Sequence, residues 1–233
     1  MKAVNKIPGR RGGGNAGSRR QPEKTREQIL EAALAEFSQK GLGGARIDAI
    51  ASRAGVNKRM IYHYFGNKDE LFSTVLISAY EAFRQNDASL TTADLDPLEG
   101  MHKLVEFTFN YMQENRHLVA LLNSANLHRG RHLQNSDRIR ELYSPLIDMI
   151  AALLLRGERS GIFRTGVDPV NLYISIAGLA YFYFSNIHTL SAVFGRDLED
   201  PALVESQRRH VVELVLASLR VGAGPELQPG GQE

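Results

Sequence analysis

The residues of this chain best suited to chemistry are cations and hydrogen-bonding rings between Lys58 and His63. Lys58 and Arg59 carry donors that can bind phosphate or the acceptor atoms of guanine, and Tyr62 and His63 can contact bases or backbone. A short helix with such side chains at its exposed start fits the major groove of DNA. The pattern therefore predicts a segment that binds DNA and reads its sequence.

The elements that must position these side chains are a helix, a tight turn and a second short helix. Apolar residues repeat at helical spacing from Ile47 to Ala54. Gly55 follows where the chain must turn sharply, and Asn57 stands where a new helix needs a cap. This order, continued to Lys68, is typical of a helix-turn-helix.

The chain resembles the TetR family of transcriptional regulators over residues 55–71, GVNKRMIYHYFGNKDEL. Upstream, Phe37, Gly41 and residues 47–51 fall where the pattern of that family has an aromatic residue, a glycine and a V/I-x-x-I-A run. The resemblance covers roughly residues 25–75, and the remainder is similar only in length and helical character. It implies an operator-binding protein whose DNA affinity responds to a small molecule.

The candidate DNA contacts extend beyond the second helix of this motif. Arg26 and Arg46, each at the start of a predicted helix, could reach phosphates or remain solvated surface charges. The resemblance implies that Tyr64 and Lys68 clamp the DNA backbone, although Tyr64 could instead bury its ring. The full candidate set is Arg26, Arg46, Asn57, Lys58, Arg59, Tyr62, His63, Tyr64 and Lys68.

Charge is divided unevenly along the chain. Up to Lys68 there are 14 Lys and Arg against 5 Asp and Glu, and after it 14 against 21. A basic first third can release counterions from a phosphate backbone, whereas the acidic remainder is repelled by one. We therefore expect any nucleic acid to meet the first third of the molecule.

The fold class expected is all-α, with an N-terminal three-helix helix-turn-helix DNA-binding domain followed by a larger helical ligand-binding and dimerisation domain. Residues 1–22 are basic and glycine-rich and should form a disordered arm, either a soluble tail or a grip on phosphate or the minor groove. The DNA-binding domain then spans 23–68, the effector-binding and dimerisation domain spans 69–221, and a disordered tail spans 222–233.

The most apolar segment runs over residues 170–194, and its apolar side chains lie on more than one face. Such a segment should be buried on more than one side. Ser175, Gly178, Phe182 and Ser185 fall along one strip, where small residues permit close approach of another helix. This segment and the amphipathic helix after it carry surplus apolar surface, which indicates a homodimer through the two C-terminal helices, where TetR-like proteins pair. The alternative is a monomeric bundle core.

Polar residues within the helical remainder could line a cavity for a mostly apolar small molecule with a few hydrogen-bonding groups. The family resemblance implies an effector of this kind, of unknown identity. The same residues could instead be satisfied polar groups at helix ends or on the surface. The candidate effector-binding residues are Asn110, Asn123, Asn126, Tyr143, Tyr173 and Tyr181.

No catalytic constellation stands out in the sequence, which has no nucleotide-binding loop, no Gly-x-Ser-x-Gly elbow, no His-Glu-x-x-His and no cysteine. We therefore expect no enzyme, no cofactor and no catalytic residues. His128 and His132 are four residues apart but flank Gly130 in a predicted loop, so we expect no metal site. No apolar run reaches membrane-spanning length, and we expect a cytoplasmic protein without a membrane partner.

Together these features predict a homodimeric, sequence-specific transcriptional regulator, with repression as the favoured mode. Two helix-turn-helix units would enter successive major grooves of a pseudo-palindromic double-stranded DNA operator, and a small-molecule effector would release them. One alternative is an architectural or interaction module that binds nucleic acid without sequence preference through its basic arm. Another is an enzyme that uses the helical pocket for catalysis.

Overall fold

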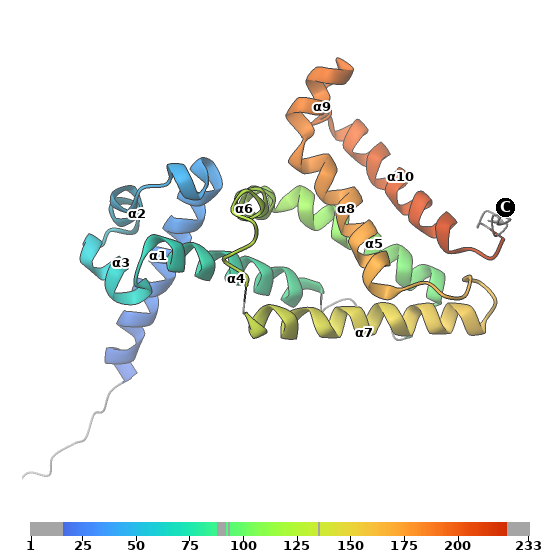
Figure 1. The fold of residues 1–233 in the computed structure, drawn as a ribbon, viewed down its shortest axis with the longest axis horizontal. Helices are drawn as coiled ribbons and strands as arrows, with labels where there is room; N and C mark the ends of the chain where they lie inside the picture. The colour runs from blue at the N-terminus through green and yellow to red at the C-terminus, as the bar shows by residue number, and fades with distance from the viewer. Residues whose placement is uncertain (1–15, 88–91, 93, 135, 223–233) are drawn as a thin grey trace, which may run out of the picture.

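The computed structural model describes residues 16–87, 92, 94–134 and 136–222, which form ten α-helices in two units joined by α4 (Figure 1). Within these ranges the backbone pairing outside helices is one isolated β-bridge between Phe163 and Arg220. The all-α expectation is therefore confirmed. In chain order the helices are α1 (Ala16–Gly44), α2 (Ile47–Ala54), α3 (Lys58–Phe65), α4 (Lys68–Asp87), α5 (Pro97–Glu114), α6 (Arg116–Leu127), α7 (Asp137–Arg159), α8 (Pro169–Ser185), α9 (Ile187–Phe194) and α10 (Pro201–Leu219).

The DNA-binding unit consists of α1, α2 and α3 around a small apolar core. Ile29 and Phe37 of α1, Ile50 of α2, and Ile61 and Phe65 of α3 are all buried in it. Each helix contributes residues three or four positions apart, as the apolar stripe of the sequence predicted. The core thus fixes how α3 is presented to solvent.

Glycines shape both turns of this unit. Gly41 leaves the helical conformation with φ 62° and ψ 176°, so the regular part of α1 ends there. Gly55 closes α2 in the left-handed region with φ 65°, which glycine adopts without the steric penalty of a Cβ. The predicted turn of the helix-turn-helix is therefore present.

The start of α1 differs from the expectation of a disordered arm over residues 1–22. The helix begins at Ala16 and includes Pro22, so residues 16–22 belong to α1, and the extent of a disordered arm stays a prediction. The expectations for residues 1–15 and for residues 223–233 lie outside the described residues.

Helix α4 belongs to both units. Its first half packs on α1, where the rings of Phe37 and Phe72 meet edge to face at 5.1 Å. Its second half packs against α7, where the rings of Tyr80 and Tyr143 lie 5.8 Å apart. One continuous helix therefore carries contacts to both units.

The larger unit packs α7, α8 and α10 around α5 (Figure 1). Three of its helices begin at Asp-Pro pairs, at residues 96–97, 168–169 and 200–201. In each pair the Asp side chain accepts a backbone N–H of the first turn, at 2.9, 2.7 and 2.7 Å, and the proline takes the first helical position.

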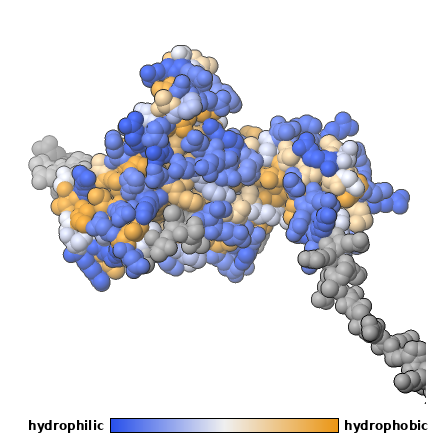
Figure 2. All heavy atoms as spheres, turned by 180° about the vertical axis from the view of Figure 1, so that it is seen from behind, coloured by the Kyte–Doolittle hydropathy of each residue, from blue (hydrophilic) through white to orange (hydrophobic). Residues whose placement is uncertain are grey.

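The apolar segment 170–194 breaks at Asn186 into α8 and α9, which are bent by 69°. Helix α8 packs against α5, α6, α7 and α10, in agreement with the expected burial on more than one side. It leaves one strip uncovered, where Ile174 is 60% and Phe182 59% exposed. Seen from behind, the larger unit shows apolar patches on an otherwise largely hydrophilic surface (Figure 2). Among the described helices none is alone long and apolar enough to cross a membrane, and the bent α8–α9 pair passes that test only when its two helices are joined.

Candidate DNA-binding face and effector cavity

Helix α3 is capped at its N-terminus and packed from beneath. Asn57 caps it, because its side-chain oxygen accepts the N–H of Arg59 at 2.9 Å. Ile61 and Phe65 hold its inner face in the core. The N-terminal half of its outer face is therefore rigidly presented to solvent.

The outer face of α3 carries the predicted reading residues. The side chains of Arg59, Tyr62 and His63 are exposed, and 43% of the Tyr62 surface is accessible to solvent. Tyr64 is half-buried, with its ring 5.5 Å from that of His63 and 6.2 Å from that of Phe65. The ring of Tyr64 therefore packs, as the alternative interpretation held.

Lys58 is exposed but already has an ionic partner. Its Nζ lies 2.9 Å from a carboxylate oxygen of Asp48 on α2. The hydrogen bond to Asp48 raises the pKa of Lys58 above its ordinary value, so the ammonium stays charged. A DNA phosphate would have to compete with this carboxylate for Lys58.

Two further cations flank α3. The guanidinium of Arg26 lies 5.4 Å from the centre of the Phe65 ring, a cation–π distance that places Arg26 beside the end of α3. Arg46 is exposed at the start of α2, and its backbone N–H donates to the carboxylate of Glu36 at 3.2 Å. The hydrogen bond from Lys40 lowers the pKa of Glu36, which stays ionised as an anchor for this turn.

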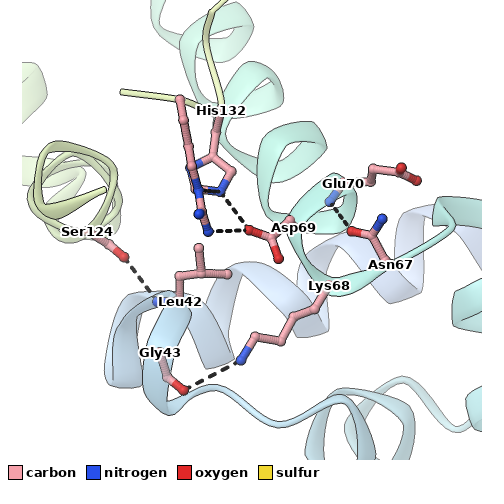
Figure 3. A network of polar contacts seen from close by, with 9 residues as sticks. Leu42, Gly43, Asn67, Lys68, Asp69, Glu70, Ser124 and His132 are labelled. Carbon is pink, nitrogen blue, oxygen red and sulfur yellow. Dashed lines mark hydrogen bonds and ion pairs between the residues drawn. The ribbon is translucent and has the colours of Figure 1, made fainter. Parts of the chain in front are cut away.

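Lys68 is directed into the protein. Its ammonium donates to the carbonyl of Ala45, between α1 and α2, at 2.9 Å. It also lies 3.5 Å from the carbonyl of Gly43, in the last turn of α1 (Figure 3). These contacts hold the turn before α2 against the start of α4. They give Lys68 a structural role beside the phosphate contact that the resemblance implied.

A polar network connects the DNA-binding unit to the larger unit. Asp69, at the start of α4, lies 2.6 Å from Arg131 and 3.1 Å from the Nε2 atom of His132 (Figure 3). The hydrogen bond to His132, followed by the charge of Arg131, lowers the pKa of Asp69. On the other side, the N–H of Leu42 donates to the hydroxyl of Ser124 on α6 at 3.0 Å.

This network accounts for the two histidines weighed above as metal ligands. His132 is buried, binds Asp69 and packs its ring edge to face on Phe72 at 4.9 Å. His128 packs against His132 at 5.8 Å between ring centres. The described residues contain no group of three His, Cys, Asp or Glu side chains arranged to hold a metal ion.

The larger unit contains a cavity of about 260 Å³ between α4, α5, α6, α7 and α8, which we call the tyrosine cavity. Its walls combine aliphatic and aromatic side chains with four phenol groups, from Tyr80, Tyr143, Tyr173 and Tyr181. The hydroxyls of Tyr143 and Tyr173 are 3.4 Å apart, and that of Tyr181 donates to Asn123 on α6. The cavity therefore offers apolar walls with a few fixed polar groups, the pattern of a small-molecule site.

Five of the six predicted effector residues gather here. Asn126, Tyr143, Tyr173 and Tyr181 line the cavity, and Asn123 lies behind Tyr181. Asn110 does not line it, because it is two residues, about 200° of helix rotation, from the lining residue Met112. Asn110 therefore lies outside the lining of the tyrosine cavity, and a role for it in effector binding stays a prediction.

Tyr80 and Arg84 were missed. Arg84 is buried, and its guanidinium lies 4.0 Å from the ring centre of Phe83 and 4.8 Å from that of Tyr143. Burial raises the pKa of Tyr80 to about 12 and that of Tyr143 well above its ordinary value, so both stay neutral donors. Tyr80 and Arg84 are four residues apart on one face of α4, and this spacing was the sequence signal that could have paired them.

Comparison with known proteins gives the same division of the chain. Residues 29–75 match the family model described as bacterial regulatory proteins, tetR family, and residues 97–215 match that of the tetracyclin repressor-like C-terminal domain. The HTH-type transcriptional repressor NicS of Pseudomonas putida is 36% identical over 86% of this chain and 94% of its own length. The HTH-type transcriptional repressor SCO4008 of Streptomyces coelicolor is 32% identical over 69% and 79%.

Solved structures share the fold at lower identity. FadR from Bacillus subtilis, in complex with stearoyl-CoA, is 18% identical and superposes with a TM-score of 0.62 over 84% of this chain and all of its own. FadR from Bacillus halodurans is 22% identical, with a TM-score of 0.60 over 84% of this chain and all of its own. At this identity the two structures support the arrangement of helices.

Proposed function

The chain belongs to the TetR family of bacterial regulatory proteins and is a DNA-binding transcriptional regulator, and from this premise we propose that it represses transcription from a two-fold symmetric operator until a small molecule enters the tyrosine cavity. The observation that carries this proposal is the outer face of α3. There Arg59, Tyr62 and His63 are exposed on a helix that is capped and packed from behind. Such a face presents hydrogen-bond donors at the edges of base pairs.

Within the operator the basic side chains take different roles. Arg59 is suited to guanine, which accepts two hydrogen bonds from a guanidinium, and Tyr62 and His63 to bases or the sugar-phosphate backbone. Lys58, Arg26 and the other cations near α3 bind phosphates and set the register. We assign the DNA-binding domain to residues 23–68 and the effector-binding and dimerisation domain to residues 69–221, with α4 as the connection.

Regulators of this family act as dimers, and we assign the interface to α8 and α10. Ile174 and Phe182 of α8 and Leu214 of α10 are exposed apolar side chains in the single chain. Between these helices runs a groove of about 480 Å³, lined by Ser175 and Leu214 among others. Pairing of two copies would bury this surface and place the two α3 helices on one side of the DNA.

The tyrosine cavity sets the size of the effector. Its volume of about 260 Å³ equals roughly nine water molecules at their volume in the liquid, and it lies below the usual range of drug-sized pockets. The polar groups available are the four phenol hydroxyls and the amide of Asn126. A compact, planar, mostly apolar molecule with two or three hydrogen-bonding groups fits these walls.

Helix α6 couples the cavity to DNA. Leu122 and Asn126 line the cavity, Asn123 binds the hydroxyl of Tyr181, and Ser124 accepts the N–H of Leu42 in the DNA-binding unit. A ligand that moves Tyr181 shifts α6 and with it the DNA-binding unit. The coupling is reciprocal, so operator DNA weakens effector binding by the same factor.

The test is binding of the purified protein to its own promoter region at physiological salt with competitor DNA, followed by footprinting. A protected, two-fold symmetric site is the expected result. Salt-sensitive protection equal across all sequences would instead favour the architectural alternative, in which cations bind phosphate without reading bases. The enzymatic alternative would be supported by catalytic turnover that persists in a variant whose α3 no longer contacts bases.

A further inference from the structure

We infer that a second copy of the chain, paired across α8, forms the outer wall of the tyrosine cavity, so that the effector site is complete only in the dimer. The inference rests on the proposed function, because it takes this cavity as the effector site and α8 as part of the interface. One chain supplies the floor and sides of the cavity, and its partner supplies the cover.

The first observation is that two residues belong to both surfaces. Ile174 and Gly178 line the tyrosine cavity, and both are exposed on the uncovered strip of α8. A Cβ built on Gly178 would meet nothing within 4 Å, so the space outside this residue is open. Asn126, across the cavity on α6, is also exposed. The mouth of the cavity therefore opens directly onto the strip.

The second observation is the contrast between the inner and outer walls. On the inner side, Phe83 is 1% exposed and Met112 3%, and burial raises the pKa of Tyr143. On the outer side Ile174 remains 60% exposed. Small-molecule sites normally remove most of the ligand surface from water. A mostly apolar ligand in this cavity would leave one side in water unless something covers Ile174 and Gly178.

The third observation identifies the cover. Residues 169–194 contain no Asp, Glu, Lys or Arg. A two-fold axis places the residues nearest to it against their own copies, where a charge would face a like charge, and an uncharged strip avoids that repulsion. Ser175 and Gly178 are small enough for a helix to approach closely, and Phe182, 59% exposed, supplies apolar area beside them. A second copy of α8 fits these requirements.

The experiment uses the absence of cysteine from the chain, because one introduced thiol then reports on one place. Ala177 lines the cavity from α8 and is partly buried, so Ala177→Cys puts a thiol just inside the mouth with little added volume. Its rate of reaction with 4,4′-dithiodipyridine, an uncharged reagent that an added carboxylate does not repel, is measured in the dimer and in the same protein with Phe182→Glu, which puts like charges at the strip. The Ala177→Cys thiol should react roughly tenfold more slowly in the dimer than in the protein that also carries Phe182→Glu.

A matched control lies on α4. Ser78 is also partly buried and lines a different hollow, away from α8. The thiol of Ser78→Cys should react at the same rate with and without Phe182→Glu, which excludes a general loosening of the fold. Should Phe182→Glu not fold, dilution of the Ala177→Cys protein through its dimer dissociation range gives the same comparison. The rate should rise as monomer appears in sedimentation.

Two results overturn the inference. If Phe182→Glu remains a folded dimer in sedimentation, pairing does not use the α8 strip and the partner cannot cover the cavity. If it is monomeric and the Ala177→Cys thiol reacts no faster, the mouth is open in the dimer as well. Either result leaves operator binding by the protein untouched, so footprinting decides the proposed function separately.

Discussion

The backbone N–H of Leu42 donates a hydrogen bond of 3.0 Å to the hydroxyl of Ser124, across the boundary between the DNA-binding unit and α6. The residue before Leu42 is Gly41, where an added Cβ would lie 3.5 Å from the same hydroxyl. The backbone of the turn after α1 therefore sits directly against α6. This contact places the DNA-binding unit one residue away from Asn123, the neighbour of the cavity.

Replacing Ser124 by Ala should weaken this junction. Both groups are buried, and loss of the hydroxyl removes the acceptor of the Leu42 N–H, which should lower the free energy of unfolding by about 1 to 2 kcal/mol. The specific readout is hydrogen exchange, in which the Leu42 amide should exchange faster. Ser73→Ala, at a partly buried serine of α4, is the control and should leave that amide unchanged. An unaltered Leu42 amide in Ser124→Ala would contradict the role of this bond.

Arg59→Ala and Tyr62→Ala should each weaken operator binding with no change in fold. Both side chains are exposed, so each loses a DNA contact without loss of packing, and a base contact is worth about 1 to 3 kcal/mol. Binding is measured by titration on the footprinted operator and on unrelated DNA. Arg159→Ala, an exposed arginine at the far end of α7, serves as the control (Figure 1). Normal operator affinity in both variants would refute the assignment of the α3 face.

Asp48→Asn should strengthen DNA binding. The carboxylate of Asp48 lies 2.9 Å from the Lys58 ammonium, so it occupies a cation that DNA phosphate needs and also repels the phosphate. Without it, the slope of log affinity against log salt should steepen by up to about 0.9, the contribution of one more phosphate contact. Asp137→Asn breaks a similar surface pair with Arg140 far from α3 and should leave the slope alone. Weaker binding by Asp48→Asn would mean that the pair instead orients Lys58 for DNA.

The sequence predicted the DNA-binding face but not its ion pairs, because the face depends on local signals and the ion pairs depend on how two helices pack. Gly55, Asn57 and the apolar residues of α3 act on neighbours within a few positions, and such local signals are readable from the chain. The partner of Lys58 is ten positions away, on another helix. Its identity depends on the angle between α2 and α3, which no local pattern contains.

The cavity shows the same limit over longer distances. The amphipathic side chains of Tyr143, Tyr173 and Tyr181 made them candidates for the cavity. Asn110 was an equally good candidate from the sequence, but the orientation of α5 places it away from the cavity. Arg84 lies in the polar last turn of α4, and its burial depends on rings from α7 and α8. Packing of helices far apart in sequence decided each of these outcomes.

The contribution of Asp69 to stability should disappear in acid. Its pKa is lowered from the ordinary 3.8 by the hydrogen bond to His132 and the charge of Arg131. A carboxyl with a lowered pKa in the folded state stabilises the protein fully above the unfolded pKa, and the effect is lost as the pH falls through the folded value. The difference in urea midpoint between the native protein and Asp69→Asn should therefore persist from pH 7 to about pH 4 and shrink below 3.8.

Asp148→Asn controls this comparison, since Asp148 is exposed on α7. Its effect on the urea midpoint should be small at pH 7. A difference between the native protein and Asp69→Asn that stays constant down to pH 3 would mean that Asp69 acts through packing and not through its charge.

The tyrosine cavity should make stability fall at high pH. Burial raises the pKa of Tyr80 to about 12, whereas in the unfolded chain it ionises near its ordinary value of 10.0. Because the raised pKa belongs to the folded state, the stabilisation is complete below pH 10 and is lost as the pH rises toward 12. Between pH 10 and 11 the native protein should lose about 1 kcal/mol of unfolding free energy relative to Tyr80→Phe.

This comparison is made by urea unfolding at pH 8, 10 and 11, with Tyr62→Phe as the control because Tyr62 is 43% exposed. Tyr62→Phe should follow the native protein at every pH. Parallel behaviour of Tyr80→Phe would instead mean that water reaches the Tyr80 hydroxyl and that the cavity is wetter than its walls indicate. The expected divergence means that Tyr80 offers a neutral O–H donor throughout the physiological range. An effector would then be recognised there by its hydrogen-bond acceptors, independently of pH unless the effector itself titrates.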